Sequence, residues 1–153
     1  MKLIVATLFC TLIAVANAGG TPLTQAQAEA RLIPNGITAS SSGGCTDRCT
    51  SYQGILSGTV DGVITLKNAA GVSSLVITGG TETGHATGGT YTHGNGYKVD
   101  VRHSTQLDNY IKTAFTKIAN RGDGYPQWRA ASGNIYCVSA FSGIQRNVQG
   151  AHR

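Results

Sequence analysis

The spacing of apolar residues predicts three helices, and the clearest of them follows Ser104. Ser104 predicts the N-cap of this helix and Gly122-Asp123-Gly124 predicts its end. Asp108 near the start and Lys117 near the end match the helix dipole. Six apolar residues at helical spacing form one face of the helix: Leu107, Tyr110, Ile111, Ala114, Phe115 and Ile118.

Two shorter helices are predicted upstream. Thr24 and Gln27 have the spacing of a capping box, and the helix that they open ends at Pro34-Asn35-Gly36. Residues 59–70 carry apolar side chains at helical spacing and are followed by Gly71. The β-branched residues in this segment also fit a strand, but we favour the helix.

Three short segments have the pattern of strands. Residues 74–78 have an apolar centre, Leu75-Val76-Ile77, and are followed by Gly79-Gly80. Residues 97–102 form a second predicted strand, which carries Asp100. A final strand begins at Ile135, after a turn-rich loop at residues 122–128. Two or three helices on a small antiparallel sheet make the predicted fold class α+β.

The first eighteen residues predict a cleaved signal peptide. Lys2 is followed by an apolar run, Leu3–Val15, and by the cleavage pattern Ala16-Asn17-Ala18. The run is too short for a membrane span. We therefore expect residues 19–153 to form one secreted, extracellular domain with no membrane attachment, and to be a monomer.

Export to an oxidising compartment predicts a disulfide among the three cysteines that remain, Cys45, Cys49 and Cys137. A Cys45–Cys49 bridge would close a small loop. A Cys49–Cys137 bridge would join the loop that contains Cys49 to the predicted final strand, and it would constrain much more of the unfolded chain. The sequence leaves both pairings open, and in either case one cysteine would remain as a free thiol.

The charge of the chain argues against one class of partner. The formal net charge is +5, but the basic residues are scattered and do not alternate with aromatic residues in a stripe. We therefore expect no nucleic-acid binding. A mild positive charge suits an encounter with an anionic polymer such as a bacterial wall, and it serves ordinary solubility equally well.

The candidate chemistry lies in a glycine-rich stretch, residues 78–100. His93 and Asp100 are seven residues apart, and Gly94 and Gly96 allow the backbone to turn sharply between them. Imidazole nitrogen and carboxylate oxygen are both zinc ligands. We therefore predict that a loop and a strand bring these two side chains to one metal ion. The alternative is an exposed His93, with Asp100 paired to a neighbouring base.

This stretch resembles the LAS group of zinc peptidases, and most closely its D-alanyl-D-alanine carboxypeptidase-like branch. The resemblance rests on Val76–Glu82, on Gly84-His85-Ala86 and on the HxxGxxxD pattern of His93, Gly96 and Asp100, and it extends over residues 45–136. It implies a hedgehog/DD-peptidase-like fold, a bound Zn²⁺ and hydrolysis of peptidoglycan stem peptides at D-Ala-D-Ala or a neighbouring bond.

The resemblance also implies roles for individual residues. The family's third ligand is a late histidine, which here is His152. The family's catalytic acid has no counterpart after Asp123, so Glu82 is the candidate. The arginine that binds the substrate carboxylate in the family has no counterpart near Glu82.

Two further roles are read from the residues and not from the resemblance. From its place in the loop, His85 is expected to line the substrate cleft, although it could also bind the metal, donate to a bound carboxylate or satisfy a loop carbonyl. Tyr97 is expected to add to an aromatic rim of the cleft, with core packing as the alternative.

Three functions fit these residues. The first is a secreted zinc peptidase acting on wall peptides. The second is a wall- or peptide-binding protein that keeps the scaffold and has lost hydrolysis. The third is a disulfide-stabilised secreted protein without a metal.

Overall fold

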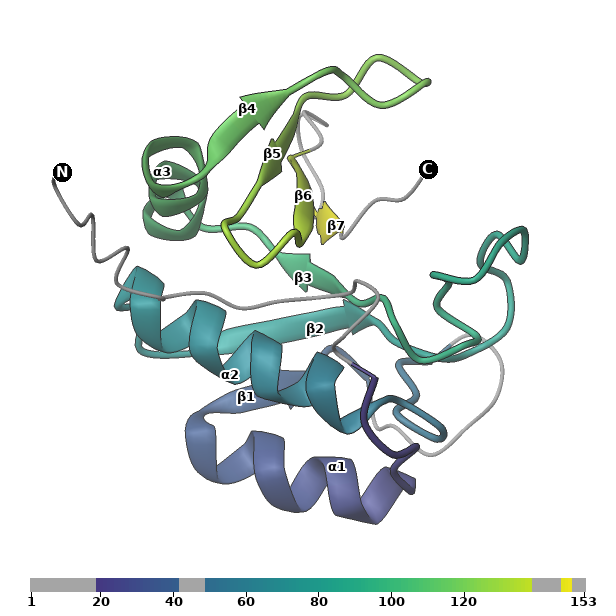
Figure 1. Ribbon diagram of the computed structural model, residues 1–153. Helices are drawn as coiled ribbons and strands as arrows, with labels where there is room; N and C mark the ends of the chain where they lie inside the picture. The colour runs from purple at the N-terminus through teal and green to yellow at the C-terminus, as the bar shows by residue number, and fades with distance from the viewer. Residues whose placement is uncertain (1–18, 42–48, 139–146, 150–153) are drawn as a thin grey trace, which may run out of the picture.

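The computed structural model describes residues 19–41, 49–138 and 147–149, the last three by their backbone alone. In this part of the chain three α-helices accompany a β-sheet (Figure 1), which confirms the α+β class. The helices are α1 (Gln25–Leu32), α2 (Ser57–Ala70) and α3 (Thr105–Ala114), with a 3₁₀ turn η1 (Ile33–Asn35) after α1. The strands are β1 (Ile37–Ala39), β2 (Leu75–Gly79), β3 (Asp100–Arg102), β4 (Thr116–Ile118), β5 (Gln127–Arg129), β6 (Ile135–Val138) and β7 (Asn147–Gln149).

The strands form one sheet in the order β1-β2-β3-β7-β6-β5-β4. The short strand β7 joins two three-stranded halves. The prediction of an antiparallel sheet was wrong for one pair, because β1 and β2 run parallel. The connection between them contains α2, the kind of crossover that parallel neighbours require.

The helices cover one face of the sheet. Side chains from α1, α2 and α3 share one core cluster with Ile77, Val101, Trp128 and Tyr136 from the strands. Because side chains alternate along a strand, Asp100 and Cys137 belong to the opposite face. The glycine-rich stretch begins at the end of β2 and returns to the start of β3. It lies at the end of these two strands that is opposite to α3 (Figure 1).

The two upstream helices form where the sequence predicts them. Thr24 and Gln27 make the reciprocal capping box of α1, and Gly36 closes η1 in the left-handed conformation, with φ 69°. The helix interpretation of residues 59–70 is confirmed. α2 begins two residues earlier, at Ser57, and ends at the left-handed Gly71.

The prediction for the third helix was too long. α3 begins after the predicted Ser104 cap but ends at Ala114, and Phe115 is already extended. The Phe115 ring stacks on Tyr136 with the centroids 4.9 Å apart, so the chain turns away and forms β4 along β5. Residues 122–128, predicted as a loop, accordingly end inside β5. Tertiary packing has overridden the helical pattern here.

The bonding state of the cysteines excludes one of the two predicted disulfides. Cys49 is disulfide-bonded, whereas Cys137 is a free and buried thiol, so a Cys49–Cys137 bridge is wrong. Cys49 lies beside Ser40 and Ser41, just after β1, and Cys137 lies in β6, four positions across the sheet. Strands about 4.8 Å apart place such residues roughly 19 Å from each other, well beyond disulfide reach.

Cys45, His152 and the predicted signal peptide lie outside the described residues. Among the helices of the described part, none has the length and apolar character needed to cross a membrane.

We predict that Gly96→Ala destabilises the protein by about 2–4 kcal/mol, through left-handed strain and overpacking. Gly96 has φ 78°, and a Cβ there would lie 2.4 Å from the Gly54 carbonyl oxygen. Its own carbonyl also accepts hydrogen bonds from Leu56 N and Thr59 Oγ1 at the start of α2. Urea unfolding measures the change. Gly94→Ala is the matched control, because a Cβ at Gly94 would have no neighbour within 4 Å; equal losses in both variants would contradict the prediction.

Candidate metal centre

The pairing of β2 with β3 places Asp100 at the centre of the candidate site. Ile77 pairs with Val101, but Gly79 pairs with Asp100, so the register shifts by one residue between the two pairs. This irregularity is a β-bulge, and bulges commonly re-aim a side chain beside a functional site. The Asp100 side chain is buried, and its Oδ1 has no hydrogen-bond partner.

His93 reaches Asp100 from the glycine-rich loop. A tight turn, closed by the Gly96 amide on the His93 carbonyl, holds the histidine backbone. The His93 Nδ1 lies 2.8 Å from the Gly80 carbonyl oxygen and therefore donates to it. This leaves Nε2 without a proton in the neutral ring, and Nε2 lies 3.5 Å from Asp100 Oδ1.

His85 completes a group of three. Its ring stacks on that of His93, with the centroids 3.8 Å apart and the planes 11° from parallel. Its Nε2 lies 2.9 Å from Glu82 Oε1 and donates to that carboxylate, which leaves Nδ1 with the lone pair. One ligand atom from each of His85, His93 and Asp100 lies within 4.8 Å of the others, so the three side chains can hold a metal ion.

Two features of the group fit a bound cation. The first is the buried Asp100 Oδ1, since a buried carboxylate oxygen without a partner is costly unless a positive charge is near. The second is the pair of outer contacts. Glu82 holds one imidazole and the Gly80 carbonyl holds the other, in the manner of the outer partners that orient metal-binding histidines.

Glu82 lies behind His85 and contacts the loop backbone. Its carboxylate accepts hydrogen bonds from the amides of Ser51, at 2.7 Å, and Gly80, at 2.9 Å, in addition to that from His85. Burial alone would raise the pKa of Glu82, but these hydrogen bonds hold it below its usual range. Glu82 is therefore an anion that positions His85, and its catalytic role stays a prediction.

Gly79 and Gly80 have no side chain, and neighbouring atoms of the site occupy the space that a side chain would fill. A Cβ on Gly79 would lie 2.9 Å from Asp100 Oδ2 and 3.1 Å from His85 Cε1. A Cβ on Gly80 would lie 1.9 Å from the Ser51 carbonyl oxygen. The two glycines that end the predicted strand are thus part of the site.

Two further predicted site residues remain, Tyr97 and His152. Tyr97 is half-buried and packs edge-on against Tyr91, with the ring centroids 5.2 Å apart. His152 lies outside the described residues, so its role as a ligand stays a prediction. The nearest described residue before it, Gln149 of β7, pairs with Asp100 through the backbone.

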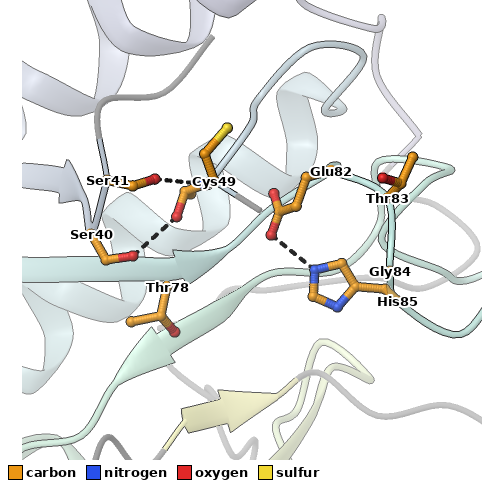
Figure 2. A pocket seen from close by; sticks show the side chains of 9 residues that line it. Ser40, Ser41, Cys49, Thr78, Glu82, Thr83, Gly84 and His85 are labelled. Atoms are coloured by element: carbon orange, nitrogen blue, oxygen red, sulfur yellow. Dashed lines mark hydrogen bonds and ion pairs between the residues drawn. The ribbon is translucent and has the colours of Figure 1, made fainter. Parts of the chain in front are cut away.

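A cavity of about 310 Å³ adjoins the group on the side of His85. Figure 2 shows Ser40 and Ser41 at one side of this cavity and Glu82 and His85 at the other. It lies where the parallel strands β1 and β2 end, a position at which parallel sheets commonly bind ligands.

Comparisons with protein-family models, curated proteins and solved structures find no match to this chain. The chemistry of the site is accordingly argued from its own side chains, which are two imidazoles and one carboxylate with their hydrogen-bond partners.

We predict that Gly79→Ala weakens the affinity of the group for a metal ion about 10–100-fold, the usual effect of disturbing the surroundings of metal ligands. The added methyl group must push aside Asp100 and His85, while the Gly79 backbone itself needs no positive φ. Isothermal titration calorimetry with Zn²⁺ measures the affinity. Gly88→Ala in the same loop, where a Cβ meets nothing within 4 Å, should leave it unchanged.

We predict two effects of Glu82→Gln. The affinity for a metal ion, titrated as Zn²⁺, falls about 10–100-fold, because His85 loses its anionic partner. The second effect follows from the lowered pKa of Glu82 in the folded protein. The stability that this carboxylate contributes above its unfolded pKa disappears as the pH falls through the lowered value. The variant should therefore lose less stability on acidification than the wild type.

Urea unfolding at several values between about pH 3 and pH 7 tests the second effect, since this range covers carboxylate titration. Asp61→Asn is the control, because Asp61 is an exposed carboxylate paired with Arg31. An identical acid dependence in wild type and Glu82→Gln would contradict the role assigned to Glu82.

Proposed function

We propose that this chain is a secreted zinc-dependent peptidase-like protein that acts on the stem peptides of bacterial peptidoglycan. We place it with the LAS-type zinc peptidases, in the D-alanyl-D-alanine carboxypeptidase-like branch with the hedgehog/DD-peptidase fold. The observation that carries the proposal is the convergence of His85, His93 and Asp100 around an unpartnered, buried carboxylate oxygen.

Zinc is the metal that this donor set suits best. Two imidazole nitrogens and one carboxylate oxygen make a three-ligand set of the kind found in catalytic zinc sites, which leave a further position open. In this proposal His85 offers Nδ1, His93 offers Nε2 and Asp100 offers Oδ1. When bound, the zinc ion would supply Lewis-acid polarisation of a peptide carbonyl and an acidified water.

The residues of the chain itself prepare the site. Glu82 and the Gly80 carbonyl fix which nitrogen of each histidine carries the proton, so the other nitrogens keep their lone pairs. Burial of His93 and Asp100 limits competition from water. His85 is partly exposed and borders the cavity, so a peptide lying in the cavity would have its backbone beside the metal group.

One observation favours a second candidate, a wall-peptide binder on the same scaffold that holds zinc without hydrolysis. A hydrolase of this type needs a carboxylate to carry a proton to the leaving amine. Among the described acidic residues other than Asp100, each already has a partner: Glu29 with Gln25, Asp61 with Arg31, Glu82 with His85, Asp108 with His103 and Asp123 with Arg121.

We predict that the purified mature chain holds about one zinc ion and releases D-alanine from wall peptides, and that His93→Ala abolishes both. Elemental analysis and an assay for free D-alanine measure the two quantities. His103→Gln is the control, because His103 pairs with Asp108 and is not part of the metal group. It should keep its zinc and its activity.

The outcomes separate the candidates. Zinc without D-alanine release favours the binder. A folded protein without zinc contradicts both candidates. Hydrolysis that survives His93→Ala shows that the activity has another source.

A further inference from the structure

A second cavity, of about 350 Å³, lies against the hairpin of β4 and β5. Its lining comes from residues 118–122, from Gln127 and Arg129 of β5 and from Ile135 of β6. Trp128, between the two β5 residues, packs in the core with the helices, so Gln127 and Arg129 point to the other face of the sheet. The cavity therefore lies on the face of the sheet opposite to the helices.

The same face carries Asp100 of the metal group. Gln127 pairs with Cys137, Cys137 with Gln149 and Gln149 with Asp100. Paired residues of neighbouring strands point to the same face of a sheet, so the two ends of this row share one face. Three strand spacings of about 4.8 Å place the backbones of Gln127 and Asp100 roughly 14 Å apart. The cavity is thus separate from the metal group.

Two arginines make the cavity cationic. Arg121 and Arg129 line it, and none of the described lining residues is acidic. Arg121 Nε donates to the Asp123 carboxylate at 2.8 Å, and its guanidinium lies over the Tyr125 ring, 5.5 Å from the centroid. The Arg129 side chain has no ion pair or hydrogen bond within the described part of the chain. Its charge is therefore available to an anion that enters the cavity.

The sequence limits the negative charge that the other residues can bring to this cavity. After Asp123 the chain contains no aspartate or glutamate, so residues 139–146 and 150–153 carry no acidic side chain. The one acidic residue outside the described ranges is Asp47. Its segment follows β1, at the opposite edge of the sheet from β4. The excess of positive charge around the cavity is therefore a property of the sequence.

Two further positive charges favour an anion on this face. Burial lowers the pKa of Lys98, Asp100 raises it and Arg121 lowers it, so Lys98 lies close to both of these charges. A zinc ion in the metal group would add its own positive charge beside Asp100. The metal that the proposed function assumes therefore strengthens the attraction of an anion to the cavity.

Gln127 supplies an uncharged partner for a ligand. Only 9 % of this residue is exposed, and it lines the cavity. Its side-chain amide has no hydrogen bond within the described part of the chain. A buried amide without a protein partner is costly unless another molecule takes its hydrogen bonds. Its NH₂ group can donate to an anion, and its carbonyl can accept from a hydroxyl group.

We propose that this cavity is a second binding site, which takes the phosphate group of a phosphorylated polyol or sugar. A carboxylate offers its oxygens in one plane, and Asp123 already meets Arg121 in that way. A phosphate monoester carries three acceptor oxygens that point in different directions, so it can contact Arg129 and Gln127 together. The inference goes beyond the proposed function, because the site lies outside the metal group.

The size and the lining of the cavity favour a small ligand without a base. At about 350 Å³ the cavity is at the lower end of the range of ligand pockets. None of the described lining residues is aromatic, so the base of a nucleotide would find no ring on which to stack. The hydroxyl groups of a polyol, in contrast, have the Gln127 carbonyl as a partner.

The test titrates three probes into the full mature chain at about pH 8, where a phosphate monoester carries close to two negative charges. The probes are glycerol phosphate, glycerate and adenosine monophosphate. Nuclear magnetic resonance follows the side-chain amide of Gln127 and the Nε proton of Arg129. We expect saturable shifts of both signals with glycerol phosphate, and an affinity at least about 10-fold higher than that of glycerate. Adenosine monophosphate should bind no more tightly than glycerol phosphate.

Three results would overturn the inference. The first is the absence of saturable shifts with glycerol phosphate. The second is an equal affinity for glycerate, which would show that the cavity does not select phosphate. The third is tighter binding of adenosine monophosphate, which would assign the cavity to nucleotides.

A pair of variants shows whether the cavity binds the probe. Arg129→Gln should weaken the binding of glycerol phosphate about 10-fold or more, because it removes a charged hydrogen-bond donor from the lining. Arg102→Gln is the matched control, since Arg102 is an exposed arginine of β3 that does not line this cavity. Equal losses in both variants would mean that the probe responds only to the overall charge, and would overturn the inference.

A bound zinc ion is a second place at which a phosphate can bind. Each titration is therefore run on the zinc-loaded chain and repeated after a chelator has removed the zinc. Binding to the cavity should persist without zinc, because Arg129 and Gln127 are not part of the metal group. Binding that disappears with the zinc would place the phosphate on the metal and overturn the inference.

These measurements do not depend on the proposed function. A chain that holds no zinc or hydrolyses no peptide still reports whether the cavity binds glycerol phosphate. Conversely, D-alanine release by a chain that binds none of the probes would support the proposed function and overturn this inference.

Discussion

The pairing of β2 with β3 is the constraint on which the candidate site depends. A regular antiparallel register would continue from the Ile77–Val101 pair, but the bulge sets Asp100 opposite Gly79 instead. The same strand end releases the loop whose Gly80 carbonyl holds His93. The irregular pairing therefore positions Asp100 and leaves space for its side chain at Gly79. It also places the Gly80 carbonyl that accepts the hydrogen bond from His93. Because Val101 packs in the core beside Ile77, the bulge is tied to the most buried part of the fold.

Local signals predicted the parts of the fold that depend on local chemistry. The capping box of α1, the Ser104 cap of α3 and the glycine stop of α2 need only neighbouring residues, and all three are present. The end of α3 could not be predicted in this way. It depends on Phe115 meeting Tyr136, a contact between residues far apart in sequence. The strands β1, β5 and β7 are three residues long, too short to show an alternating pattern.

One part of the candidate site could be predicted from the sequence, and another part could not. Spacing around two glycines indicated His93 and Asp100 as a pair, and the structure brings their side chains to 3.5 Å. The position of His85 in the group follows from the path of a long loop, which no periodicity describes. Glu82, three residues before it, was the available signal, because a carboxylate at that distance can hold the imidazole. The importance of Gly79 depends on side chains from two other segments.

The stacking of His85 on His93 has a consequence for how the site would respond to an ion. The lone pairs of an imidazole lie in the plane of its ring, so two rings only 11° from parallel direct them side by side. For both nitrogens to converge on one cation, the rings have to splay apart. Each ring would then leave the magnetic shielding of the other. The carbon-bound protons of these two histidines would thus distinguish an empty site from an occupied one in a proton resonance spectrum.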